Sequence, residues 1–156
     1  MDQCKSSTIP MQKNVKLSCD DGSKEVNGTM YRQIVGSLNY LTTTRPDISY
    51  YVSLLSQFME KPHENHWNAA KAVLGYLKGT LDYGIKCIYA SYVDLTSYLD
   101  SHWDGNPDDR RSTTGYAFGI RSGVVSWSSK KQPTVSLSST EAEYKALCAA
   151  TCEVVW

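Results

Sequence analysis

The sequence lacks a long apolar run, because no stretch approaches the roughly 18 consecutive apolar residues of a membrane-spanning helix. The N-terminal segment MDQCKSSTIPMQKN also lacks the apolar core of a signal peptide. The 5 cysteines form an odd set without CxxC spacing, which argues against a disulfide framework and against a structural zinc site. These absences predict an intracellular, soluble chain without a membrane partner.

The sequence also lacks net charge, since 16 Lys and Arg residues balance 16 Asp and Glu residues. There is therefore no overall attraction to nucleic acid, and any such binding has to come from local basic patches. The 156 residues, 41% of them hydrophobic, suffice for one domain or two small ones.

Helical periodicity is present between residues 29 and 80. Apolar residues recur at helical spacing from Tyr31 and again after Pro46, which suits the first position of a helix. A third helix is predicted from about Asn65 to Lys78, with Gly79 as its stop signal. Residues 1–28 show no such periodicity and predict an extended or weakly ordered arm.

The pattern becomes strand-like after residue 80, and a last helix is predicted from about Ser138. This order predicts an α+β fold, with a small helical unit followed by antiparallel strands and one C-terminal helix. Trp127 alternates with Val125 in a way that predicts packing toward the core. Cys148 and Cys152 are spaced so that they lie on one face of the last helix, where we expect buried thiols. The predicted strands are Tyr83–Tyr89, Leu95–Ser101, Gly115–Ile120 and Val124–Ser129.

Two carboxylates are placed where they can serve chemistry. Asp100 ends a predicted strand and Glu143 lies in the first turn of the last helix. Phosphodiester hydrolysis by two metal ions needs several carboxylates around ions about 4 Å apart, and Mg²⁺ prefers such hard oxygen ligands. Taken alone, Asp100 is more typical of a solvated turn than of a catalytic site, while Glu141 and Glu143 both suit a helix N-terminus.

Five blocks occur along the chain in a fixed order. They are CKSSTIPM, YRQIVGSLNYLTTTRPDISYYVSLLSQFM, HWNAAKAVLGYLKGTLDYGI, DSHWDGNPDDRRSTTGY and SWSSKKQPTVSLSSTEAEY. In this order they resemble the Pol polyprotein of copia-type (Ty1/copia) LTR retrotransposons. The resemblance implies three parts: an arm at 1–28, a helical reverse transcriptase connection region at 29–80, and a truncated ribonuclease H-like domain at 81–156.

The resemblance also implies an activity and its ligands. Asp100 and Glu143 match the first two catalytic carboxylates of the family and would be Mg²⁺ ligands, with Glu143 chosen over Glu141 by the segment AEYKAL. His102 stands where the family usually has an acidic residue. The remaining catalytic aspartates of the family lie downstream of Trp156, so we expect weak Mg²⁺ binding and impaired or absent hydrolysis of RNA in RNA/DNA hybrids.

Two basic pairs, Arg110-Arg111 and Lys130-Lys131, flank a predicted hairpin and are candidates for phosphate contacts with an RNA/DNA hybrid or another nucleic acid. A solvated hairpin surface is the alternative. The resemblance implies work in the cytoplasm or nucleus, and an open sheet edge would favour self-association. The competing hypothesis is a nonenzymatic, decayed transposon remnant with at most weak nucleic-acid binding.

Overall fold

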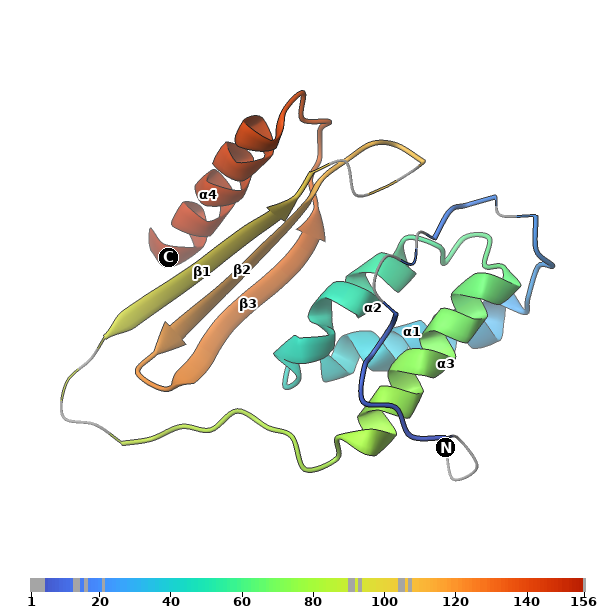
Figure 1. Ribbon diagram of the computed structural model, residues 1–156, viewed down its shortest axis with the longest axis horizontal. Helices are drawn as coiled ribbons and strands as arrows, with labels where there is room; N and C mark the ends of the chain where they lie inside the picture. The colour runs from blue at the N-terminus through green and yellow to red at the C-terminus, as the bar shows by residue number, and fades with distance from the viewer. Residues whose placement is uncertain are drawn as a thin grey trace. The chain divides into compact units, whose positions relative to one another are not determined.

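The computed structural model describes residues 5–12, 15, 17–20, 22–89, 92, 94–103, 106 and 108–155, so part of the expected N-terminal arm lies outside the described residues. The chain divides into two compact units, Met1–Gly84 and Ile85–Trp156 (Figure 1). None of the helices within the described ranges is long and apolar enough to cross a membrane.

The first unit is helical, as the periodicity predicts. It contains α1 (Gly28–Leu41), the 3₁₀ helix η1 (Pro46–Ile48), α2 (Ser49–Ser56) and α3 (Glu64–Gly79). The side chain of Asn27 caps α1 by accepting a hydrogen bond from the main-chain N–H of Met30 at 3.1 Å. Pro46 occupies the first turn of η1, where its missing N–H costs nothing.

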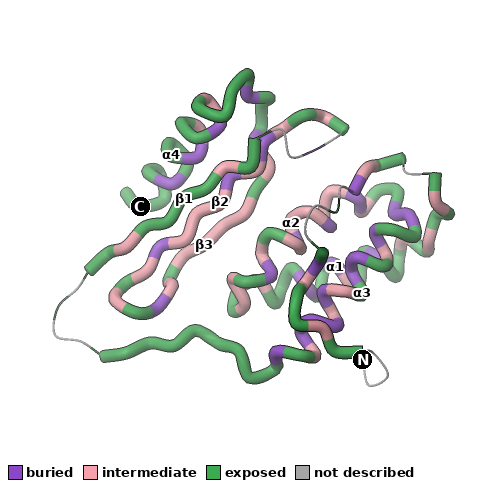
Figure 2. The backbone as a smooth tube through the Cα atoms, in the orientation of Figure 1, coloured by how far each residue is buried: buried purple, intermediate pink, exposed green. Residues whose placement is uncertain are grey.

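The core of the first unit joins the apolar stripes of these helices (Figure 2). The Tyr31 hydroxyl, fully buried, donates to the main-chain oxygen of Leu55 at 2.9 Å and so links α1 to α2. Met11 and Leu17, from the stretch expected to be an arm, are also buried in this core. Its fully buried apolar members are Tyr31, Val35, Leu38, Ile48, Val52, Leu55, Ala70 and Val73.

A polar cluster closes the turn before η1 against the end of α3. The Arg45 guanidinium donates two hydrogen bonds to Asp47 at 2.9 and 2.8 Å and two to Thr80, and the hydroxyl of Tyr76 donates to Asp47 at 2.8 Å. Because each ionised oxygen of Asp47 has a donor, the half-buried pair is well satisfied.

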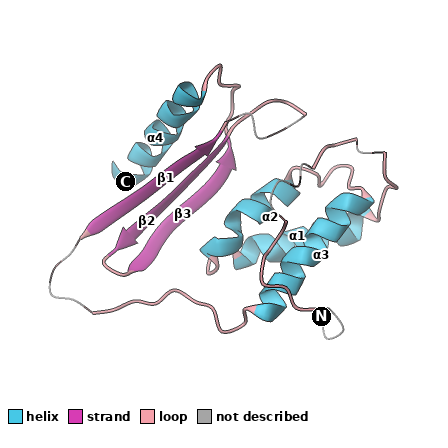
Figure 3. Ribbon diagram, viewed as in Figure 1, coloured by secondary structure: helices cyan, strands magenta, loops and turns pink. Residues whose placement is uncertain are grey.

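The second unit is a three-stranded antiparallel sheet with one helix (Figure 3). Its strands are β1 (Leu95–His102), β2 (Thr113–Ile120) and β3 (Gly123–Lys131), in the order β1-β2-β3, and α4 (Ser139–Val155) contacts β1 and β2. Both units together confirm the α+β class.

The strand predicted at Tyr83–Tyr89 is wrong. These residues are exposed and form no ladder with the described strands, although the N–H of Ile88 donates to the hydroxyl of Ser122 in the turn before β3. The other three strands form within two residues of their predicted ends.

Candidate functional site

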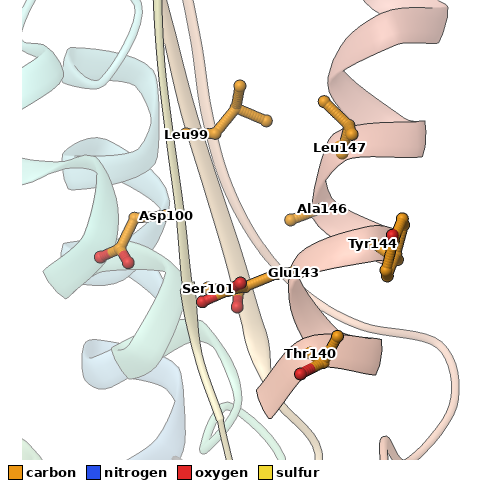
Figure 4. Close-up of a pocket in the computed structure, with 8 residues that line it drawn as sticks. All are labelled: Leu99, Asp100, Ser101, Thr140, Glu143, Tyr144, Ala146 and Leu147. Carbon is orange, nitrogen blue, oxygen red and sulfur yellow. The ribbon is translucent and has the colours of Figure 1, made fainter.

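A pocket of about 500 Å³ lies between β1 and the N-terminal half of α4 (Figure 4). It brings together the two carboxylate residues chosen from the sequence, since both belong to its lining. The floor comes from one edge strand of the sheet and the wall from two turns of helix. Its lining residues are Leu99, Asp100, Ser101, Thr140, Glu143, Tyr144, Ala146 and Leu147.

A buried amide fixes α4 over the sheet. Gln132, which directly follows β3 and is 3% exposed, donates through Nε2 to Oγ1 of Thr114 at 3.0 Å and to the main-chain oxygen of Ala142 at 2.9 Å. Its Oε1 accepts from the hydroxyl of Ser136 at 2.9 Å. Both amide protons are thus used, and Thr114 lies on the side of β2 that faces α4.

The register of β1 on β2 decides where the two carboxylates point. Ser101 pairs with Thr114, and Asp100 pairs with Gly115. Paired residues share a face of the sheet, whereas neighbours along a strand point to opposite faces. Ser101 therefore faces α4 and Asp100 faces away from it. Figure 4 shows the same arrangement, with Glu143 pointing toward Ser101 and the carboxylate of Asp100 on the far side of β1.

This arrangement does not fit a magnesium site that uses both carboxylates. Asp100 contributes to the pocket from the strand, but its carboxylate is turned away from that of Glu143. Among the described residues there is no group of three or more His, Cys, Asp or Glu side chains able to hold a metal ion. The assignment of Asp100 and Glu143 as ligands stays a prediction.

The first turn of α4 is satisfied within the chain. The hydroxyl of Ser138 accepts from the N–H of Glu141 at 3.1 Å, and the Glu141 carboxylate accepts from the N–H of Leu137 at 2.8 Å. Lys145 donates to Glu141 at 2.8 Å and to the main-chain oxygen of Val135 at 3.0 Å. Lys145 and then the Leu137 N–H hold the pKa of Glu141 below its ordinary value. Glu141 is thus a capping residue, which leaves Glu143 available to the pocket.

Asp109 neutralises part of the basic hairpin surface. Its carboxylate lies 2.6 Å from Nζ of Lys131 and 3.6 Å from Nε of Arg111. Burial alone would raise its pKa, but the bonds from Lys131 and Arg111 outweigh burial and lower it. Arg110 has a left-handed φ of 59° at the turn, and Lys130 is exposed. Of the predicted phosphate-contact residues, Arg111 and Lys131 therefore share the carboxylate of Asp109, while Arg110 and Lys130 are exposed.

Two packing expectations are wrong. Cys148 and Cys152 are exposed, because Ala142, Ala146 and Ala150 occupy the face of α4 that meets the sheet. The expectation that Trp127 packs toward the core also fails. Trp127 pairs with Ala117 in the row of side chains that points away from α4, the same face that carries Asp100.

Ser101 is a site residue that the sequence did not predict, and Gln132, which the sequence placed beside the basic pairs as a possible phosphate contact, is instead buried under α4. Ser101 shares the pocket with Glu143, and Gln132 sets the position of the helix that carries Glu143. The signal available in the sequence was a polar residue, Gln132, directly after a strand and ten residues before Ala142. Only the fold shows that Gln132 is buried.

The chain is similar to Pol polyproteins of plant transposons. It is 48% identical over 147 residues to the Retrovirus-related Pol polyprotein from transposon RE2 of Arabidopsis thaliana, which covers 94% of this chain and 10% of that protein. It is 40% identical to the corresponding polyprotein from transposon TNT 1-94 of Nicotiana tabacum, over 100% of this chain and 12% of that protein. The chain therefore spans about a tenth of the length of these curated relatives.

A shorter relative is covered almost completely. The chain is 50% identical over 127 residues to Secreted RxLR effector protein 161 of Plasmopara viticola, which covers 81% of this chain and 89% of that protein. No protein-family model matches the chain, and no solved structure matches it.

Proposed function

Because the chain belongs to the copia-type, retrovirus-related Pol polyproteins, we propose that its second unit is part of a ribonuclease H-type domain acting on RNA/DNA hybrids. In this proposal Asp100 and Glu143 are the carboxylates that the unit contributes to a magnesium-dependent site. Because the carboxylate of Asp100 is turned away from that of Glu143, we expect hydrolysis by this chain to be impaired or absent. The first unit is then the reverse transcriptase connection region.

One observation carries the proposal: Asp100 and Glu143, 43 positions apart in the sequence, line the same pocket between β1 and α4. The chain's own contribution is positional. Gln132 holds α4 on the sheet, and Glu143 is directed into the pocket without a competing capping role.

The proposed partner is a nucleic acid held through its phosphates. Lys130 is exposed at the end of β3, and Arg110 stands at the turn after Asp109. Because Arg111 and Lys131 already share the carboxylate of Asp109, their contribution is reduced. The resulting affinity is low and depends on salt, as expected for contacts with the backbone alone.

A second candidate function is nonenzymatic, a transposon-derived unit that binds nucleic acid weakly. The orientation of Asp100 favours it, because the carboxylate points away from the pocket that Glu143 lines. In this reading β1, which lies at one end of the strand order, also offers its free edge for self-association. Size-exclusion chromatography over a range of protein concentrations detects such association directly.

The magnesium part of the proposal is tested by titrating the full chain with MgCl₂ while following the amide NMR signals of Ser101 and Glu143. We expect weak, saturable shifts that disappear in Glu143→Gln. Glu153→Gln, which changes an exposed carboxylate at the other end of α4, is the matched control and retains them. Shifts of equal size in both variants would overturn the assignment of Glu143.

A further inference from the structure

We infer that β1 exchanges between two pairing registers on β2, one residue apart, and that the shifted register turns Asp100 toward α4. The register described above is then the resting one. This inference rests on the proposed function only where it joins Asp100 to Glu143. The exchange itself follows from how weakly β1 is anchored.

The side chains of β1 give little preference for one face over the other. None of its eight residues is buried. Tyr98, on the face away from α4, is 69% exposed, and Leu99, on the face toward α4, is still 40% exposed. A strand register is strongly specified where one face is buried and weakly specified where neither is.

The neighbouring strands are fixed far more firmly. Phe118 of β2 is 4% exposed, and Thr114 is bonded to the buried amide of Gln132. Gln132 follows β3 and also holds α4, so β2, β3 and α4 form one frame. β1 hydrogen-bonds to this frame along β2 alone among the described strands, because it is the end strand. Movement of β1 changes its pairing with β2 and its contacts with α4, but it leaves the hydrogen bonds of Gln132 within the frame intact.

A shift of one residue, about 3.3 Å along the strand, places Asp100 opposite Thr114, where Ser101 now lies. Every side chain of β1 then changes face. The carboxylate of Asp100 enters the position that shares the pocket with Glu143. Both carboxylates then lie on one side of the sheet.

The same shift exchanges one apolar contact for another. Tyr98 takes the position of Leu99 opposite Tyr116, on the side of α4. Leu99 moves opposite Gly115, where the glycine offers no side chain to clash with it. The apolar cover of α4 is thus maintained.

Two hydrogen bonds at the ends of β1 must re-form. The N–H of Arg121 donates to the main-chain oxygen of Asp94 at 2.9 Å, and the indole N–H of Trp103 donates to that of Ser136 at 3.1 Å. Like charges at Asp100 and Glu143 disfavour the shifted register, and a bound cation favours it. A cation that binds the shifted register more tightly increases its population.

Disulfide trapping tests the exchange. In the full chain with all 5 cysteines changed to serine, Thr114→Cys is combined with a second cysteine at one of three positions on β1. The Ser101→Cys pair reports the resting register, and the Asp100→Cys pair reports the shifted one. The Tyr98→Cys pair is aligned in neither register and is the control. All three proteins lose the same bond between Thr114 and Gln132, so they are matched.

In a glutathione redox buffer, the Ser101 pair should oxidise fastest. The Asp100 pair should oxidise roughly 10- to 1,000-fold more slowly, in proportion to a minor state of about 0.1–10%, and faster than the Tyr98 control. Oxidation of the Asp100 pair no faster than the control would overturn the inference.

The wild-type chain gives an independent measurement that needs no substitution. Relaxation dispersion at the amides of Gly115 and Gly119 should reveal exchange with a minor state, and MgCl₂ should increase its population. If the Asp100 pair is trapped but MgCl₂ does not change the population of the minor state, the register exchange is supported and the proposed metal site is contradicted. Flat dispersion at both amides would contradict the inference itself.

Discussion

Ser101, rather than Asp100, is the β1 residue that faces Glu143 across the pocket between the sheet and α4. Adjacent residues of a strand point to opposite faces, so a difference of one position decides whether a carboxylate can meet Glu143.

Ser101→Asp should strengthen Mg²⁺ binding, because it places a second carboxylate on the face that carries Glu143. The same charge placed on the opposite face by Ser129→Asp is the control, since Ser129 lies in the row of Asp100 and Gly115. Isothermal titration with MgCl₂ should show tighter binding for Ser101→Asp alone. Equal affinities for the two variants would mean that the faces are not assigned correctly.

Gln132→Ala should destabilise the second unit by about 2–4 kcal/mol, since it leaves buried polar atoms of Thr114, Ser136 and Ala142 without their partner. Thr134→Ala, an exposed position two residues away, serves as the control and should stay within about 0.5 kcal/mol of wild type. Native-state amide exchange in α4 provides the measurement. If the backbone amides of α4 are protected from exchange equally well in Gln132→Ala and in the wild type, the side-chain amide of Gln132 does not hold the helix.

Asp47→Asn should destabilise the first unit by about 1–3 kcal/mol at pH 7, because Arg45 and Tyr76 lose an ionised acceptor. The hydrogen bonds from Arg45, with that from Tyr76, hold the pKa of Asp47 below its ordinary value against the opposing effect of burial. A carboxyl with a lowered folded pKa contributes stability above its unfolded pKa of about 3.9, and this is lost as the pH falls through the folded pKa.

Urea unfolding of the wild type and Asp47→Asn at several pH values measures that contribution. The two unfolding curves should differ at neutral pH and converge in acid. Glu60 is an exposed carboxylate in the same unit, so the difference in stability between Glu60→Gln and the wild type should not change with pH in this way. A difference that persists unchanged below the folded pKa would contradict the ionised pair.

Asp109→Asn should tighten binding to an RNA/DNA hybrid, because it releases the charges of Arg111 and Lys131 while its side-chain oxygen still accepts from the N–H of Arg111. The slope of log affinity against log salt should become steeper by about 1–2. Lys130→Ala should weaken binding instead. Fluorescence anisotropy at several salt concentrations distinguishes these outcomes, and weaker binding by Asp109→Asn would argue against a phosphate-contact surface.

The helices of the first unit were predictable because their signals are local. The stop at Gly79 lies within one residue of the observed end of α3, and Pro46 marks the start of η1. The burial of Met11 and Leu17 was not predictable, since two isolated apolar residues show no period. They are buried only because the helices of this unit provide a core for them.

The second unit shows the limit of such reasoning. Alternation predicted β1 well but predicted an additional strand at Tyr83–Tyr89, because a strand also needs a partner that no local pattern supplies. Asp100 and Glu143, the two carboxylates chosen from the sequence, both line one pocket in the structure. The direction of the Asp100 carboxylate depends on register, which is a property of the β1 and β2 pairing and not of β1 alone.

The most direct test of the account is cleavage of a labelled RNA/DNA hybrid by the purified, folded chain in MgCl₂, beside Asp100→Ala and Glu143→Ala. With the carboxylate of Asp100 turned away from Glu143, we predict no cleavage above that of the two variants. Cleavage by the wild type that is lost in both variants would contradict this claim. It would show that the two carboxylates meet in an active site, either within one chain or with the help of a second copy.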